Sequence, residues 1–333
     1  MRRLSEFATK LQVIVERFSS DASEVDRADA IPASHLDALA TIGLYGAFAP
    51  VSEGGLGLTL RELCGVVEEL AAACLASTFV WIQHFRLLAA VLEPSAPPLL
   101  RDQFSKVVDG ETKGGVALGG LLPGPAKMIA TPAEDGWLLD GEAPWVSGWG
   151  LVDRLFVAAR GPDDTVVNFL IEAKDQRGLV VSRHRLSALH ATVTVKLNFD
   201  ELAIGADRVL GQVPYDPSQE APEGLRVNGS LALGVARRSC TLLGPTALDD
   251  ELRSRRDELD QANFETMPLA RAGACELAVR AAHALAVQRG SSSVLEGDVA
   301  ERTAREAALL LTFGSRPAIR RALLQRFGVA TTI

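Results

Sequence analysis

The sequence is poor in aromatic residues and in basic charge, and each shortage excludes a class of protein. Phe, Trp and Tyr make up 5% of the 333 residues, so the hydrophobic fraction of 47% is largely Ala, Leu and Val and favours closely packed helices. The formal net charge is -8 at pH 7, which argues against a nucleic-acid partner because binding to phosphates needs a basic surface.

Cysteine is also scarce, and the four cysteines form no CxxC pair. Cys64, Cys74, Cys240 and Cys275 stand in apolar helical patterns. This arrangement supports neither a metal knuckle nor a redox motif. We therefore expect four small core residues and no metal site.

Long apolar runs without charges are missing. The most apolar region, CGVVEELAAACLASTFVWI, contains Glu68 and Glu69, which argues against a membrane span. The first segment, MRRLSEFATKLQVIVERF, is interrupted by Glu6, Lys10 and Glu16, unlike a secretory apolar stretch. We expect a cytoplasmic protein without a membrane partner.

Three stretches that differ in composition and hydrophobic periodicity predict three domains: an α-helical domain at 1–110, a β domain at 111–215 and a helical bundle at 216–333. In the first domain, apolar residues recur at the spacing of one helix face at Leu60, Leu63, Cys64, Val67, Leu70 and Cys74. In the last, LARAGACELAVRAAHALAVQRG has a narrow polar stripe among alanines, which indicates a bundle. Such a bundle usually buries a face against a symmetric copy, so we expect an oligomer.

The middle stretch predicts an antiparallel sheet. Short β-rich runs alternate with turn signals, and the runs are KMIAT, GWLLDG, RLFVAAR, VVNFLIEA, GLVVSRH and TVTVKLNFDEL. None is followed by a long helix, so a barrel or sandwich is favoured over a doubly wound sheet. No GxGxxG fingerprint follows a strand, and a Rossmann domain is therefore disfavoured.

Helices, then a small β domain, then a helical bundle is an uncommon order, and specific segments resemble the acyl-CoA dehydrogenase family. The segments are LDALATIGLYGAFAPVSEGGLGLT, GEAPWVSGWGLVDRLFVAAR, LNFDELAIGADRVLG and AVQRGSSSVLEGDVAERTAREAALLLTFGSRPAIRRALL, and together they span nearly the whole chain. The resemblance implies an α+β multidomain fold with an N-terminal helical domain, a middle antiparallel β-barrel domain and a shortened C-terminal bundle. It also implies FAD between the β domain and the bundle, and an acyl thioester substrate.

The resemblance assigns cofactor contacts to four residues. Trp145 and Ser147 match a Trp followed two positions later by Thr or Ser, and this spacing places both side chains on one face of a strand. The indole is then expected to pack on the isoalloxazine, while the hydroxyl donates to its N5 or O4 region. Leu118 and Gly119 stand in the family's flavin-binding loop, where they offer only backbone groups.

The catalytic carboxylate of the family is absent from its usual place. The resemblance puts Gly314 where many members carry Glu in a Tyr-Glu-Gly-Thr turn, and glycine cannot take a proton. Glu223, at the start of the first bundle helix, is a weak replacement because a shift of one residue rotates a side chain by about 100°. His84 is the first candidate for a replacement base, since histidine is well matched to proton transfer near neutrality and monooxygenases of this fold use histidines near the flavin.

The sequence also lacks the segment with which members of the family bind the pyrophosphate of FAD. The bundle is too short for the Arg-x-x-Phe-Gly turn by which a neighbouring subunit holds FAD, and a diphosphate needs positive partners. FAD is the expected cofactor, with FMN or no flavin as alternatives.

Three functions are consistent with the sequence. The leading hypothesis is a flavin-dependent oxidoreductase acting on an acyl thioester, carried by CoA or a carrier protein, or on a related small molecule. The second is a flavin-dependent monooxygenase of the same fold. The third is a non-catalytic subunit that pairs with an active paralogue, so that the oligomer is either homomeric or formed with that paralogous subunit.

Overall fold

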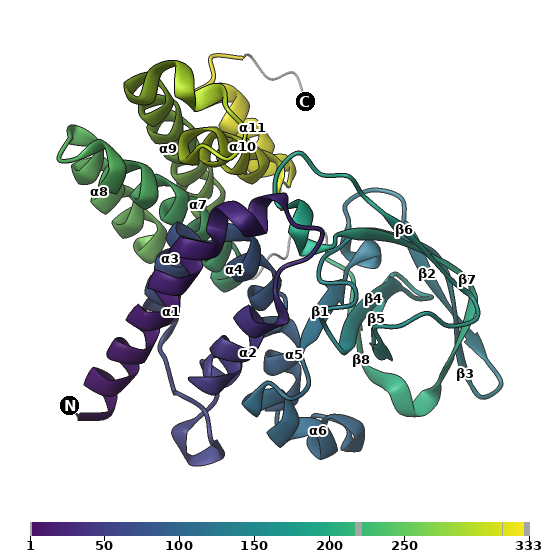
Figure 1. The fold of residues 1–333 in the computed structure, drawn as a ribbon. Helices are drawn as coiled ribbons and strands as arrows, with labels where there is room; N and C mark the ends of the chain where they lie inside the picture. Colours follow the sequence, from purple (N-terminus) through teal and green to yellow (C-terminus); the bar gives the residue numbers. More distant parts are fainter. Residues whose placement is uncertain (1, 217–221, 315, 330–333) are drawn as a thin grey trace.

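The computed structural model describes residues 2–216, 222–314 and 316–329, and these form three packed parts in chain order (Figure 1). The first part is helical, and its α-helices are α1 (Arg2–Arg27), α2 (Ala33–Thr41), α3 (Leu60–Ala73), α4 (Leu75–Ile82), α5 (Phe85–Leu92) and α6 (Pro98–Asp109). The last part is the bundle of α7 (Pro222–Leu243), α8 (Ala247–Gln261), α9 (Met267–Arg289), α10 (Val299–Thr312) and α11 (Pro317–Arg326). This order confirms the predicted fold class.

The middle part is a single eight-stranded sheet. Its strands are β1 (Gly114–Ala117), β2 (Met128–Ala133), β3 (Gly136–Val146), β4 (Arg154–Arg160), β5 (Thr165–Glu172), β6 (Leu179–Arg183), β7 (Val195–Gly205) and β8 (Val209–Pro214). The order is β6-β7-β3-β2-β4-β5-β8, with β1 attached to β4. Each of the six predicted β-rich runs overlaps one of the strands β2 to β7.

The sheet departs from the prediction in two respects. β1 pairs with β4 in parallel, because the β2–β3 hairpin lies between them in sequence and supplies the crossover that parallel strands need. β2 also meets β4 in parallel, at Ile129 and Arg160. The sheet is strongly curved (Figure 1), but in the described ranges no ladder joins β6 to β8, so it is open rather than a closed barrel.

Helix α3 shows how the predicted apolar face becomes part of the core. A capping box begins the helix: the Glu62 N–H donates to Thr59 Oγ1 at 3.3 Å, and the Thr59 N–H donates to the Glu62 carboxylate at 2.9 Å. The predicted face is buried at Leu63, Val67 and Leu70. This face stabilises the helix by packing, as the periodicity indicates.

Helices α3 and α7 approach each other very closely at a glycine. A Cβ atom added at Gly234 of α7 would lie 2.6 Å from the Glu68 carbonyl oxygen and 2.7 Å from the Ala71 Cβ. The side chain of Glu68 is itself 3% exposed and accepts hydrogen bonds from Arg256 of α8 at 2.6 and 3.0 Å. The N-terminal helices and the bundle are therefore joined by both close packing and a partly buried ion pair.

The most apolar stretch and the cysteines lie in the interior. Leu75–Leu92 is long and apolar enough for a membrane span by composition, but it covers α4 and α5 and 67% of it is buried inside the protein. All four cysteines are buried and free, as predicted.

We predict that Gly234→Ala lowers the free energy of unfolding by about 1–3 kcal/mol, because the new methyl group would overlap backbone atoms of α3. Gly65→Ala on α3 is the matched control: nothing lies within 4 Å of its added Cβ, so it should be neutral or stabilise by up to about 1 kcal/mol. Urea unfolding of both variants measures the difference. Equal effects of the two substitutions would contradict the close contact.

Candidate functional site

Trp145 presents its indole at the surface near the end of β3. Its side chain is 63% exposed, which is high for so large an apolar group. The His184 ring lies against the indole, with ring centroids 4.5 Å apart and planes tilted by 31°. The His184 Nε2–H donates to the Pro144 carbonyl at 2.7 Å, so the histidine is tied to the same strand that carries the indole. His184 therefore supports Trp145 from one side and leaves the indole accessible.

Ser147 is placed differently from Trp145. β3 ends at Val146, and Gly148 adopts φ 90°, so Ser147 lies just beyond the strand, where the backbone changes direction, and is only 7% exposed. The sequence predicted that both side chains share one strand face. The structure corrects this prediction, because strand alternation stops where the backbone turns.

The Ser147 hydroxyl is the first member of a buried chain of hydroxyl groups. Ser147 Oγ lies 2.8 Å from Thr194 Oγ1, which lies 2.8 Å from Thr192 Oγ1. Thr192 Oγ1 donates to the Leu189 carbonyl at 2.7 Å. Each hydroxyl has one proton, so Thr194 must donate to Thr192, and Ser147 must donate to Thr194. Towards a ligand, Ser147 Oγ is left with acceptor capacity, whereas the sequence predicted a donor.

The turn that carries Thr192, one of these hydroxyl groups, is flanked by two residues with a left-handed backbone. Thr192 belongs to a short 3-10 turn, His190–Thr192, whose flanking residues Leu189 and Val193 have φ values of 58° and 47°. Such left-handed conformations cost about 1–3 kcal/mol each in residues other than glycine. The Gly148 N–H also donates to the Thr192 carbonyl at 2.8 Å, so the strained turn is tied to the segment that carries Ser147.

The loop at Leu118 and Gly119 lies against the same end of β3. Gly119 begins the 3-10 turn Gly119–Leu121, and a Cβ atom there would lie 2.4 Å from the carbonyl oxygen of Glu142, three residues before Trp145. The loop carbonyls are held by two guanidinium groups: Arg160 donates to Gly120 at 3.3 Å, and Arg316 donates to Leu121 at 3.0 Å. The structure thus places the predicted loop against β3 at Glu142, on the strand that also carries Trp145.

The residues beside this loop retain unused hydrogen-bonding capacity. Arg160 Nε, Asn168 Oδ1 and Tyr215 Oη are buried without a hydrogen-bond partner in the described part of the chain. The Arg160 guanidinium lies 3.2 Å from the centroid of the Tyr215 ring. Apart from these buried atoms, the exposed indole offers an aromatic face and the loop offers backbone groups, which are the kinds of group that an isoalloxazine ring uses.

His84 lies in the core. It is 0% exposed, its Nδ1 accepts a hydrogen bond from the Gly114 N–H at 3.0 Å, and its ring packs edge-on against Tyr45 at 4.7 Å. Burial lowers the pKa of the His84 imidazole to about 3. A neutral, enclosed imidazole that orients β1 does not suit the predicted role of proton acceptor.

No carboxylate replaces the missing one among the described neighbours of Gly314. Gly314 has φ 58°, and a Cβ there would meet only Asn228 Nδ2, at 3.7 Å. Phe313 packs on Phe79 with ring centroids 4.6 Å apart, and its carbonyl accepts from Arg271 at 3.4 Å. Glu223 lies exposed in the first turn of α7.

Sequence reasoning missed His184, Arg160, Arg316 and the two threonines. Strand spacing could not have found the threonines, because Thr192 lies in a 3-10 turn and Val193 has φ 47°, so the segment between them is not extended. Contacts of the other three depend on segments far apart in sequence. Within the described residues, no group of three or more His, Cys, Asp or Glu side chains gathers to hold a metal ion.

We predict that His84 contributes a pH dependence to stability. In the unfolded chain its pKa is near 6.5 and in the folded chain about 3, so between these values only the unfolded chain takes up the proton. The free energy of unfolding should therefore fall as the pH is lowered from 7 to 4, by up to about 1.4 kcal/mol per pH unit from this group. His84→Gln keeps an acceptor for Gly114 and should flatten this slope; an unchanged slope in denaturant titrations would contradict the assignment.

Comparisons with known proteins show what the sequence and the fold of this chain resemble. Residues 6–104 match the family model of the acyl-CoA dehydrogenase N-terminal domain. The chain is 29% identical over 241 residues to L-evernosamine nitrososynthase of Micromonospora sp., covering 69% of this chain and 55% of that protein. It is 27% identical over 238 residues to benzylmalonyl-CoA dehydrogenase of Aromatoleum aromaticum, covering 67% and 62% respectively. The alignments thus span less than two thirds of the length of these relatives.

A solved structure extends the likeness to the whole chain. Glutaryl-CoA dehydrogenase of Mycobacterium smegmatis, in complex with FADH2, superposes with a TM-score of 0.81 at 18% identity and covers 100% of this chain and 96% of that chain. Residues 6–104 thus match the N-terminal domain of acyl-CoA dehydrogenases, and the whole chain shares the fold of that family.

Proposed function

We propose that this chain is a flavin-dependent oxidoreductase that works without a carboxylate base, as a monooxygenase does. The observation that carries the proposal is the surroundings of Gly314: a phenyl ring, an amide and a guanidinium occupy the place where proton abstraction would need a carboxylate. His84, the other candidate base, is enclosed and neutral. Removal of an α-proton from an acyl thioester is therefore disfavoured relative to oxygenation.

The flavin surface is formed by Trp145, Ser147 and the loop at Leu118 and Gly119. A bound flavin would supply the redox chemistry, in which reduced flavin and dioxygen are consumed, one oxygen atom enters the substrate and the other leaves as water. Trp145 provides an aromatic face that His184 holds in position. Ser147 Oγ provides an acceptor, which favours a ring edge that carries an N–H group, as reduced flavin does at N5.

We extend this proposal to the identity of the flavin, the substrate, the location and the oligomeric state. FAD is the proposed flavin, supported by the FADH2 of the glutaryl-CoA dehydrogenase that shares this fold. The substrate is an acyl thioester of CoA or a carrier protein, or a related small molecule. We also propose that the protein works in the cytoplasm as an oligomer, either of identical subunits or with a paralogous subunit.

We predict that Trp145→Ala weakens flavin binding about tenfold, because an aromatic contact contributes about 0.5–1.5 kcal/mol beyond its buried area and 1.4 kcal/mol is a factor of ten. Quenching of flavin fluorescence during titration with FAD and with FMN measures both affinities. Phe264→Ala is the matched control, since Phe264 is 50% exposed in the connection between α8 and α9. Failure of the unaltered chain to bind either flavin would favour a non-catalytic subunit instead.

We predict that reduced flavin bound to the folded chain is reoxidised by air faster than reduced flavin mixed with the denatured chain. We also predict that acyl-CoA does not bleach the bound oxidised flavin when oxygen is absent. Stopped-flow absorbance at the flavin bands follows both reactions. Gly314→Glu tests the missing base directly, because it would restore a carboxylate beside Asn228. Anaerobic bleaching of the unaltered protein by an acyl-CoA would replace the monooxygenase proposal with a dehydrogenase.

A further inference from the structure

A hollow in the protein surface lies away from the proposed flavin surface. It has a volume of about 340 Å³ and lies between α1, α3, α7 and α10. Part of its wall is apolar, from Val15, Leu242 and Val299. The rest is unusually rich in guanidinium groups, because Arg237, Arg238 and Arg302 all line it.

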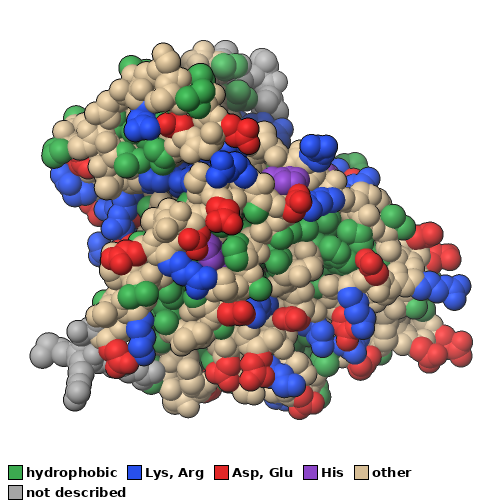
Figure 2. Space-filling view, viewed as in Figure 1, with side chains coloured by type: hydrophobic (Ala, Val, Ile, Leu, Met, Phe, Trp, Pro, Cys, Tyr) green, Lys and Arg blue, Asp and Glu red, His purple; other side chains and the backbone are tan. Residues whose placement is uncertain are grey.

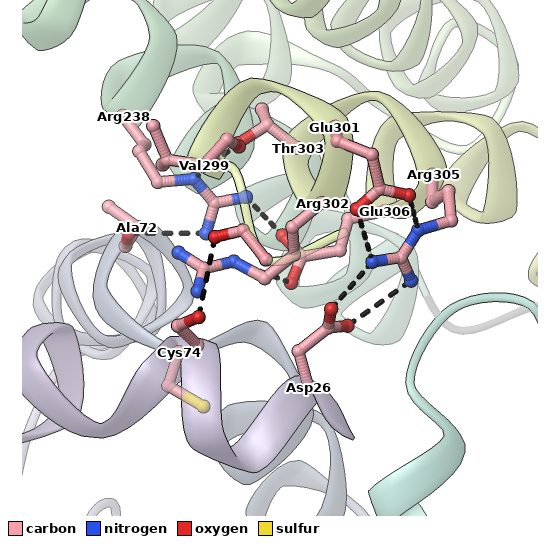
Figure 3. Close-up of polar contacts among 12 residues, drawn as sticks. Asp26, Ala72, Cys74, Arg238, Val299, Glu301, Arg302, Thr303, Arg305 and Glu306 are labelled. Atoms are coloured by element: carbon pink, nitrogen blue, oxygen red, sulfur yellow. Dashed lines mark hydrogen bonds and ion pairs between the residues drawn. The ribbon is translucent and has the colours of Figure 1, made fainter. Parts of the chain in front are cut away.

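Two of these arginines have carboxylate partners. Arg237 forms an ion pair with Glu69 at 3.4 Å. Arg238 is 7% exposed; it donates to Thr303 Oγ1 at 3.0 Å and to the Glu306 carboxylate. Its hydrogen-bonding capacity is therefore largely used within the protein (Figure 3).

Arg302 differs from both. It is 7% exposed and lines the hollow, yet within the described ranges its side chain makes no hydrogen bond, and its Nε is buried without a hydrogen-bond partner. Its nearest carboxylate oxygen belongs to Glu306 at 3.9 Å, and that carboxylate already binds Arg238. Figure 3 shows the Arg302 side chain reaching across towards Cys74 at the end of α3. The helix end supplies only about half a negative charge.

The carboxylates near Arg302 are all held by other arginines. Arg237 and Arg238 hold Glu69 and Glu306, and Arg305 holds Asp26, the other carboxylate that acts on Arg302. Burial lowers the pKa of Arg302, which agrees with a cation that lacks a full partner. A buried charge without a partner is costly, and a protein retains it where a ligand supplies the opposite charge.

We propose that this hollow binds a small organic carboxylate, with its oxygens on the free Nη groups of Arg302 and its apolar body against Val15, Leu242 and Val299. A guanidinium matches a carboxylate with two parallel hydrogen bonds. The apolar wall and the volume favour an organic anion over a bare inorganic one. The site is distinct from the flavin surface and does not depend on the proposed function.

The test uses the full chain and two matched ligands, butyrate and its neutral isostere butyramide. Calorimetric titration should give saturable binding of butyrate and none of butyramide. Arg302→Met, which keeps the length and removes the charge, should weaken butyrate binding about ten- to a hundredfold. Arg302→Lys should retain part of the affinity. Arg253→Met should leave it unchanged, because Arg253 is 63% exposed on α8, where it pairs with the exposed Asp250, and it does not line the hollow.

A second measurement separates ligand binding from a structural role. In buffer without carboxylates, Arg302→Met should be as stable as the unaltered chain or more stable, because Glu306 keeps Arg238 as its partner. Butyrate should raise the unfolding temperature of the unaltered chain and leave that of Arg302→Met unchanged. Equal binding of butyrate to both proteins, binding of inorganic phosphate in place of butyrate, or marked destabilisation by Arg302→Met without ligand would each overturn the proposal.

Discussion

The contact between α3 and α7 is the constraint on which the rest of the structure depends. Backbones can approach this closely only because Gly234 has no side chain, and the buried Glu68 is acceptable at the same place only because Arg256 reaches it from α8. This contact joins the N-terminal helices to the bundle. It thereby sets where α10 and the turn at Gly314 lie relative to α1, α4 and the sheet.

Whether the proposed flavin surface offers a hydrogen-bond donor or an acceptor at Ser147 depends on the direction of the neighbouring hydrogen bonds, and not on residue type alone. A serine can donate or accept, and only the line of hydroxyls that ends at the Leu189 carbonyl decides which. The strained turn at His190–Thr192 keeps these hydroxyls aligned. The same logic applies to Arg302, whose chemistry follows from the fact that Arg238 already occupies the shared carboxylate.

Much of the architecture could be predicted from local signals. The periodic face of α3, the six β-rich runs and the apolar positions of the cysteines each depend on neighbouring residues, so their pattern predicts their structure. The parallel pairing of β1 with β4 and the open edge between β6 and β8 were not predictable in this way. They depend on pairing between strands that lie far apart in the chain.

The sequence by itself determined the order of helices, sheet and bundle, the acidic net charge, and the absence of a carboxylate at Gly314, because these are properties of composition, periodicity and residue identity. Only the tertiary structure decided that His84 is enclosed, that Ser147 is an acceptor and that Arg302 Nε has no hydrogen-bond partner among the described residues. Burial and hydrogen-bond direction arise from segments that meet only in the folded chain, and these determine the charge and the proton of a side chain.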